Sequence, residues 1–149
     1  MPDPVRRAGL VWNATEQAAL RRLAEFIIGA DPEGVMPGVA DPEILARILE
    51  RAVNFERPLR RGIECLTQTT ADLTAIADER LGPHLNSRPE LRSLLRAMMQ
   101  VVAQVYYQDP RVLAALDLPA RPPFPDGHQV ETGDWSLLDP VRKRGRQAD

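Results

Sequence analysis

The chain has 149 residues, of which 44% are apolar, and its formal net charge at pH 7 is −2. That length is enough for one domain with a hydrophobic core. Acidic and basic residues are interspersed and nearly balanced, so the charge gives no reason to expect nucleic acid or a membrane surface as a partner. Cys65 is the only cysteine, which excludes a disulfide within the chain and fits a reducing compartment.

The N-terminal segment contains the pair Arg6-Arg7, which twin-arginine export signals also carry. The apolar run that follows ends at Asn13, so it is too short for the apolar region of about 7–15 residues that such a signal requires. No stretch approaches the roughly 18 consecutive apolar residues of a membrane-spanning helix. We therefore expect a cytoplasmic protein.

The first predicted helix covers residues 14–28. Asn13 and Glu16 have the spacing of a capping box, and a glycine follows the last helical residue. Trp12 precedes the cap, in the position from which an apolar side chain staples onto the helix near Gln17. Between the two caps, apolar residues recur at steps of three and four: Leu20, Leu23, Ala24 and Ile27.

Two further helices follow a loop that is rich in glycine and proline. Asp41-Pro42 combines an N-cap with a proline in the first turn, and it predicts a second helix that ends near Asn54. The third predicted helix runs over residues 59–81 and stops at Gly82-Pro83, a strong termination signal. Its threonines have low helix propensity, so we expect packing to hold it together.

The fourth predicted helix is the centre of the bundle and runs from just after Ser87 to about Tyr106. Ser87 and Glu90 have the spacing of a second capping box, with Pro89 inside the first turn. The apolar stripe of this helix is wide enough for a helix that is covered on more than one side. The helix ends before Pro110, because the residue preceding a proline avoids helical angles.

Asp109-Pro110 repeats the start formed by an N-cap and a proline, and it predicts a short fifth helix over residues 110–116. No strand pattern occurs before it. The expected fold is all-α: a helical bundle domain of four main helices plus a short fifth over residues 1–117. Residues 118–149 are expected to form a proline-rich extended C-terminal arm, whose apolar side chains predict packing on the bundle or on a partner.

Few residues of catalytic or metal-binding type stand in a recognisable spacing. The two histidines, His84 and His128, lie far apart, and no metal-ligand, nucleophile-elbow or phosphate-loop motif occurs. We therefore expect no catalytic, cofactor-binding or metal-binding residue. One alternative stays open: a free-standing small enzyme or ligand-binding protein with a pocket near the end of the fourth helix, formed by Tyr106, Tyr107, Asp109 and His128.

Several short motifs resemble those of one known family. They are Tyr106-Tyr107-Gln108-Asp109-Pro110, then Leu116-x-Leu118-Pro119 with Pro122-Pro123, and Trp135-Ser136-Leu137-Leu138-Asp139-Pro140-Val141-Arg142-x-Arg144-Gly145. In the first helix, Thr15-Glu16-Gln17 leads to Leu23-Ala24-x-x-Ile27-Ile28. Together these motifs are similar to the gluconate 2-dehydrogenase small-subunit family, also called subunit III or gamma, and the resemblance covers most of the chain.

In that family the small subunit is an accessory chain that partners a large flavin oxidoreductase of the glucose–methanol–choline type. The resemblance implies that this chain is a non-catalytic accessory subunit that binds no cofactor itself. Its partner would carry FAD, oxidise a sugar or other alcohol, and be stabilised or matured by this chain. Many relatives carry a twin-arginine leader and help to export their partner, whereas this sequence departs from them there, so we expect a cytoplasmic complex.

The residues expected to contact such a partner belong to the types that are enriched at protein interfaces. They are Tyr107, Phe124, Trp135, Leu137, Leu138, Arg142 and Arg144. Neither nucleic acid nor a membrane is among the expected partners. A third hypothesis, a regulatory helical module that binds nucleic acid, depends only on the basic cluster near the C-terminus.

Overall fold

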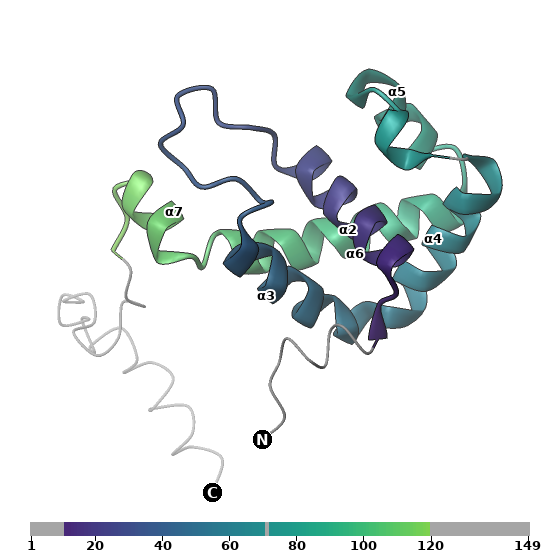
Figure 1. Cartoon of the computed structure of the whole chain (residues 1–149), viewed down its shortest axis with the longest axis horizontal. Helices are drawn as coiled ribbons and strands as arrows, with labels where there is room; N and C mark the ends of the chain where they lie inside the picture. The colour runs from purple at the N-terminus through teal and green to yellow at the C-terminus, as the bar shows by residue number, and fades with distance from the viewer. Residues whose placement is uncertain (1–10, 71, 120–149) are drawn as a thin grey trace, which may run out of the picture.

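The computed structural model describes residues 11–70 and 72–119 (Figure 1). Within those ranges the chain is helical and contains no strand, which confirms the all-α class. The helices are α2 (Ala14–Ile27), α3 (Pro42–Ala52), α4 (Glu56–Thr69), α5 (Asp78–Leu85), α6 (Pro89–Tyr106) and α7 (Pro110–Ala115), with short 3-10 turns η1 (Val53–Phe55) and η2 (Leu73–Ala75). Apart from Leu118 and Pro119, the predicted arm lies outside the described residues.

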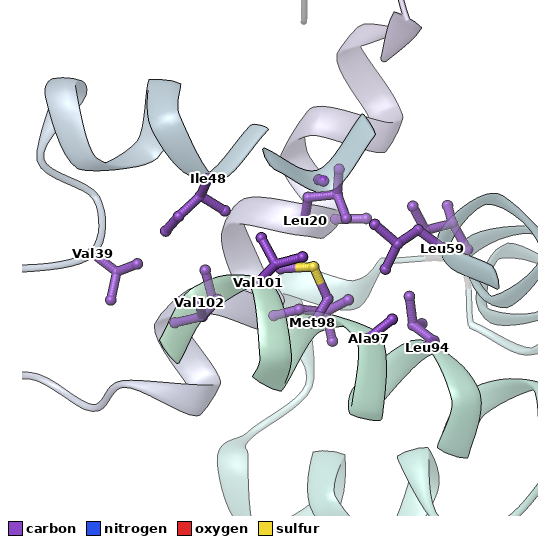
Figure 2. Close-up of a cluster of buried hydrophobic side chains, with 14 of the residues drawn as sticks. Leu20, Val39, Ile48, Leu59, Leu94, Ala97, Met98, Val101 and Val102 are labelled. Atoms are coloured by element: carbon purple, nitrogen blue, oxygen red, sulfur yellow. The ribbon is translucent and has the colours of Figure 1, made fainter. Parts of the chain in front are cut away.

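The longest helix, α6, is the centre of the bundle, as the sequence predicts. It packs against α2, α3, α4 and α5. Figure 2 shows its buried side chains meeting Leu20 of α2, Ile48 of α3 and Leu59 of α4. α6 has more buried residues than any other described helix: Leu91, Leu94, Ala97, Met98, Val101, Val102, Val105 and Tyr106.

α4 and α6 approach each other closely at a glycine. A Cβ atom at Gly62 would overlap the Cβ of Leu94, so only glycine fits at this crossing. Glycine in a helix interior costs about 1 kcal/mol relative to alanine. The cost is offset here because the two backbones approach closely and bury Leu94 completely.

Three predicted helix starts are confirmed. The Glu16 N–H donates to Asn13 Oδ1 and the Asn13 N–H donates to Glu16 Oε2, both at 2.9 Å, which completes the first capping box. Asp41 and Asp109 cap α3 and α7, each followed by a proline in the first turn. Side-chain oxygens that satisfy free N–H groups thus define these boundaries.

Trp12 packs differently from the predicted staple. Its side chain is 1% exposed, its Nε1 donates to the Leu49 carbonyl of α3 at 3.1 Å, and the Arg60 guanidinium of α4 lies 5.6 Å from its ring centroid. Gln17 Nε2 donates to the Trp12 carbonyl at 2.8 Å. Trp12 therefore connects three helices, because a buried indole N–H needs an acceptor that its own helix does not offer.

The predicted third helix over 59–81 is wrong, because the structure divides it. α4 already begins at Glu56 and ends at Thr69, whose hydroxyl donates to the carbonyls of Cys65 and Leu66. Thr70 is extended, with φ −144° and ψ 122°. Threonine hydroxyls compete with the helical backbone for its carbonyl groups, which favours a helix end at this run of threonines.

The predicted stop at Gly82-Pro83 is also wrong. α5 starts at Asp78 and continues through Pro83 to Leu85. Leu81 and Leu85, one turn apart, are both fully buried, and burying them outweighs the one backbone bond that Pro83 cannot make.

Ser87 does not cap α6, contrary to the predicted capping box. The N-cap is Arg88, which has no side-chain bond there, while Ser87 Oγ donates to the His84 carbonyl at 2.7 Å. The link between α5 and α6 is so short that this serine satisfies the end of the earlier helix instead. Pro89 in the first turn of α6 is as predicted.

Candidate partner-binding surface

The C-terminal end of α6 is anchored by a buried tyrosine. Tyr106 is 2% exposed, and its hydroxyl donates a hydrogen bond of 2.9 Å to the Pro37 carbonyl. Burial raises the pKa of Tyr106 above its ordinary value, so the hydroxyl keeps its proton and remains a donor. This bond ties the loop between α2 and α3 to the end of α6.

The next residue, Tyr107, faces outward. It ends α6, and 49% of the residue remains exposed. The rings of Tyr106 and Tyr107 meet edge to face, with centroids 5.3 Å apart and planes at 87°. Aromatic pairs favour this geometry, so Tyr107 is held by its buried neighbour while its outer surface stays accessible.

Asp109 begins α7 and is buried, with 1% exposure. Its carboxylate accepts the Arg111 backbone N–H at 2.9 Å and Arg111 Nε at 3.1 Å, and it also pairs with the Arg47 guanidinium. Hydrogen bonds from Arg111, helped by Arg47, lower the pKa of Asp109 to about 2. The carboxylate is therefore ionised at neutral pH and fully engaged with its partners.

Arg111 also reaches the cap of another helix. Its two terminal nitrogens donate to the two oxygens of Asp41, both at 3.0 Å. Asp41 itself caps α3 through the N–H groups of Glu43 and Ile44, and the Arg111 contact lowers its pKa. The ion-pair cluster, which we define as Asp41, Arg47, Asp109 and Arg111, thus joins the N-termini of α3 and α7.

The end of α7 has a fixed geometry as well. The Leu118 N–H donates to the Leu113 carbonyl at 2.9 Å, and the Asp117 N–H donates to the Ala114 carbonyl at 3.1 Å. These bonds form a Schellman motif, and Asp117 adopts the left-handed conformation that the motif requires, with φ 56°. The direction in which the chain leaves α7 is therefore set by backbone hydrogen bonds.

Large apolar side chains are exposed around these anchors. We define the apolar end of the bundle as Val35, Tyr107, Leu116 and Leu118, which are 42–63% exposed. Asp31 fixes the loop that carries Val35, because one of its carboxylate oxygens accepts the Val35 N–H at 2.8 Å. The loop, the end of α6 and α7 come together here through Pro37 and the ion-pair cluster (Figure 1).

The structure places one of the predicted partner-binding residues, Tyr107, at the apolar end. The remaining six lie outside the described residues: Phe124, Trp135, Leu137, Leu138, Arg142 and Arg144. Sequence reasoning missed Val35 and Leu116 as surface residues. An apolar residue in a proline-rich loop or at a helix end carries no periodicity that shows which way it points.

The alternative pocket gains no support from its described residues. The Tyr106 hydroxyl is bonded to Pro37 and the Asp109 carboxylate to two arginines, while His128 lies outside the described part. A surface cavity of about 370 Å³ lies nearby, at the junction of α3, η1 and the C-terminal end of α6. Arg47, Glu50, Arg51, Gln104 and Gln108 are among the residues that line it, and neither tyrosine does.

Among residues 11–70 and 72–119, no group of three or more His, Cys, Asp or Glu side chains is placed to hold a metal ion. No helix in the same ranges has the length and apolarity to cross a membrane. Comparison with protein-family models, with curated proteins and with solved structures gave no match.

Proposed function

We propose that this chain is a non-catalytic accessory subunit of a cytoplasmic, FAD-dependent oxidoreductase of the glucose–methanol–choline type, which acts on a sugar or other alcohol. The chain stabilises or matures that large subunit and holds no cofactor of its own. The observation that supports a binding role is the apolar end, where four large side chains are exposed on segments that are themselves firmly held.

The rigidity of the apolar end favours binding. Burying one large apolar side chain contributes about 1.5–3 kcal/mol, from which the cost of ordering flexible groups is subtracted. Here the ion-pair cluster fixes α7, and the Schellman motif fixes Leu118, before any partner arrives. Few groups of this surface have to be ordered on association, so most of the free energy of apolar burial contributes to affinity.

The identity of the partner comes from the sequence resemblance, and part of the resembling motif coincides with this surface. In the run from Tyr106 to Pro110, Tyr106 is the buried anchor, Tyr107 is exposed, and Asp109 is the buried cap of α7. The motif therefore contains two buried residues that fix the apolar end, Tyr106 and Asp109, and one exposed residue that can contact a partner, Tyr107. This coincidence is the reason that we place the flavoprotein there.

The test is co-purification of the tagged full-length chain from its native host, with the mass and visible spectrum of the bound protein recorded. We expect a yellow partner whose visible spectrum is that of a bound flavin. A double variant, Leu116→Asp with Leu118→Asp, should reduce its recovery at least about tenfold, equivalent to about 1.4 kcal/mol.

The matched control is Thr67→Asp with Gln68→Asp, which adds the same charges to exposed positions of α4. It should leave recovery of the flavoprotein unchanged. The proposal is wrong if the large subunit is equally soluble, loaded with FAD and active when it is expressed without this chain.

A further inference from the structure

One face of α6 is covered by no other described element, although this helix is the centre of the bundle. Arg92, Arg96, Met99, Ala103 and Tyr107 follow one another at steps of four and three, and all are exposed. Such steps place side chains on one side of a helix. We call this surface the outer face of α6; it lies opposite the inner face, whose buried side chains pack on α2, α3, α4 and α5.

The C-terminal half of the outer face continues the apolar end of the bundle. In the described ranges, the large apolar side chains that are exposed are the four of the apolar end and Met99, which is 52% exposed. Tyr107 belongs to both surfaces. Met99 precedes it by about 12 Å along the helix, at ~1.5 Å per residue, and Ala103 is exposed between them. The exposed apolar side chains therefore form one continuous surface that turns at Tyr107 and runs along α6.

The N-terminal half of the outer face is basic. Arg92 and Arg96 form no ion pair with any other residue of the described ranges. Arg92 Nη1 donates to the Asn86 carbonyl at 2.9 Å, which fixes that side chain. Glu90 lies toward α4, where its carboxylate is 3.9 Å from the Arg61 guanidinium, and no acidic residue occurs from position 91 to position 108. An incoming surface thus meets two positive charges that no described carboxylate neutralises.

The apolar end alone is small for a stable complex. A specific protein–protein interface buries about 800 Å² of each partner and uses about 20–30 residues on each side. The apolar end offers four exposed residues. The outer face adds a strip of about 22 Å from Tyr107 to Arg92, at ~1.5 Å per residue, and the two surfaces are contiguous. Together they have an apolar centre bordered by arginines, which is the composition typical of such interfaces.

We propose that the outer face of α6 is the second half of the surface that binds the large subunit, and that it binds a patch of that subunit in which carboxylates border an apolar centre. The carboxylates pair with Arg92 and Arg96, and the apolar side chains cover Met99 and Ala103. Tyr107 contacts the same partner where the two halves meet. A nucleic acid would need positive charge along its whole path, whereas half of this face is apolar.

This inference rests on the proposed function. It adds the chemistry that the partner presents and the direction in which the partner extends from the apolar end, toward the N-terminus of α6.

The first test compares charge-reversed full-length chains in the co-purification from the native host. Arg92→Glu combined with Arg96→Glu should lower recovery of the flavoprotein at least about tenfold, because its carboxylates then meet like charges. Rising salt in the wash should reduce recovery by the native chain but not by this variant, since salt screens the ion pairs. Arg21→Glu with Arg80→Glu is the matched control: it makes the same change of charge at exposed positions of α2 and α5, and recovery should not change.

A crosslink locates the contact directly. Arg96→Lys keeps the positive charge and adds a primary amine, which a carbodiimide joins to a carboxylate in direct contact. Mass spectrometry of the treated complex should find an amide bond between position 96 and an Asp or Glu of the large subunit. Arg21→Lys is the control and should give no crosslink to that subunit. Circular dichroism should show that every variant is folded, because all the substituted side chains are exposed.

The outcomes separate this inference from the proposed function. If the native chain and the Arg92/Arg96 variant recover the flavoprotein equally well, the outer face is not part of the interface, and the inference is wrong while the proposed function stands. A recovered complex without the crosslink at position 96 leads to the same conclusion, as does recovery that nuclease treatment abolishes. If the native chain recovers no flavoprotein, the proposed function is wrong and this inference with it.

Discussion

The inner face of α6 and the ion-pair cluster at α7 both fix helices in place, but different forces hold them. Along the inner face, leucine, valine and methionine side chains pack against four helices, and no charged group takes part. At α7, a six-residue helix with one buried apolar residue, Val112, is held to α3 by carboxylates and arginines.

The two regions therefore tolerate different kinds of substitution. Apolar packing is non-directional and depends on volume, so it fails when a side chain is too large or too small. A charge cluster depends on ionisation and geometry, so it responds to pH and to the loss of one partner. A helix of six residues buries too little apolar surface to be stable by packing alone, which explains why ion pairs hold α7.

The largest effect should come from overfilling the inner face. Gly62→Ala places a methyl group against Leu94, and the free energy of unfolding should fall by about 1–3 kcal/mol although alanine is the better helix former. Urea unfolding monitored by circular dichroism measures this. Gly29→Ala is the control, because no atom lies within 4 Å of a Cβ there, and equal losses in both variants would contradict the close crossing.

The second effect concerns the ion-pair cluster. Asp109→Ala removes the cap of α7 and the shared partner of Arg47 and Arg111, so we expect a loss of about 1–2 kcal/mol. The two arginines are partly exposed and regain water, which keeps the loss below that of a fully buried pair. Asp72→Ala, which removes the cap of the short turn η2, should cost less in the same assay.

The sequence predicts the inner face of α6 much better than the ion-pair cluster. Helix starts were recognisable wherever a short polar side chain caps its own helix, as at Asn13 and Asp41, because capping is local. The inner face of α6 was recognisable from the spacing of its apolar residues. These two signals together account for α2, α3, α6 and α7.

The remaining features depend on contacts between distant residues. Arg111 meets Asp41 across 70 positions, and no local pattern marks such a pair. Pro83 remains inside α5 because Leu81 and Leu85 are buried on either side of it. Ser87 donates its hydrogen bond to the end of α5 and does not cap α6. Of the candidate site, the sequence therefore predicted Tyr107 but neither the ion-pair cluster that fixes α7 nor the exposed Val35.

The ion-pair cluster should also respond to acid, whereas the inner face should not. The folded pKa of Asp109 is about 2, below the ordinary 3.8, so its stabilisation is complete above pH 5 and is lost as the pH falls from about 4 to 2. The stability difference between the native chain and Asp109→Ala should shrink over that interval. Comparing the two chains removes the effect of the other carboxylates, which both of them carry. If the stability difference stays constant from about pH 5 to about pH 2.5, Asp109 is not ion-paired.

The smallest effect should come from the end of α7, where backbone conformation replaces both apolar packing and charge. Asp117 has φ 56°, a conformation that glycine adopts without strain and a β-branched residue strongly disfavours. Asp117→Gly should therefore raise the free energy of unfolding by up to about 0.5 kcal/mol, the relief of strain being partly cancelled by the greater freedom of the unfolded chain. Asp117→Val should lower it by about 1 kcal/mol and also weaken partner recovery, because Leu116 and Leu118 lose their fixed direction. If Asp117→Val alters neither quantity, the Schellman motif does not position the apolar end, and rigidity at α7 must come from the ion-pair cluster alone.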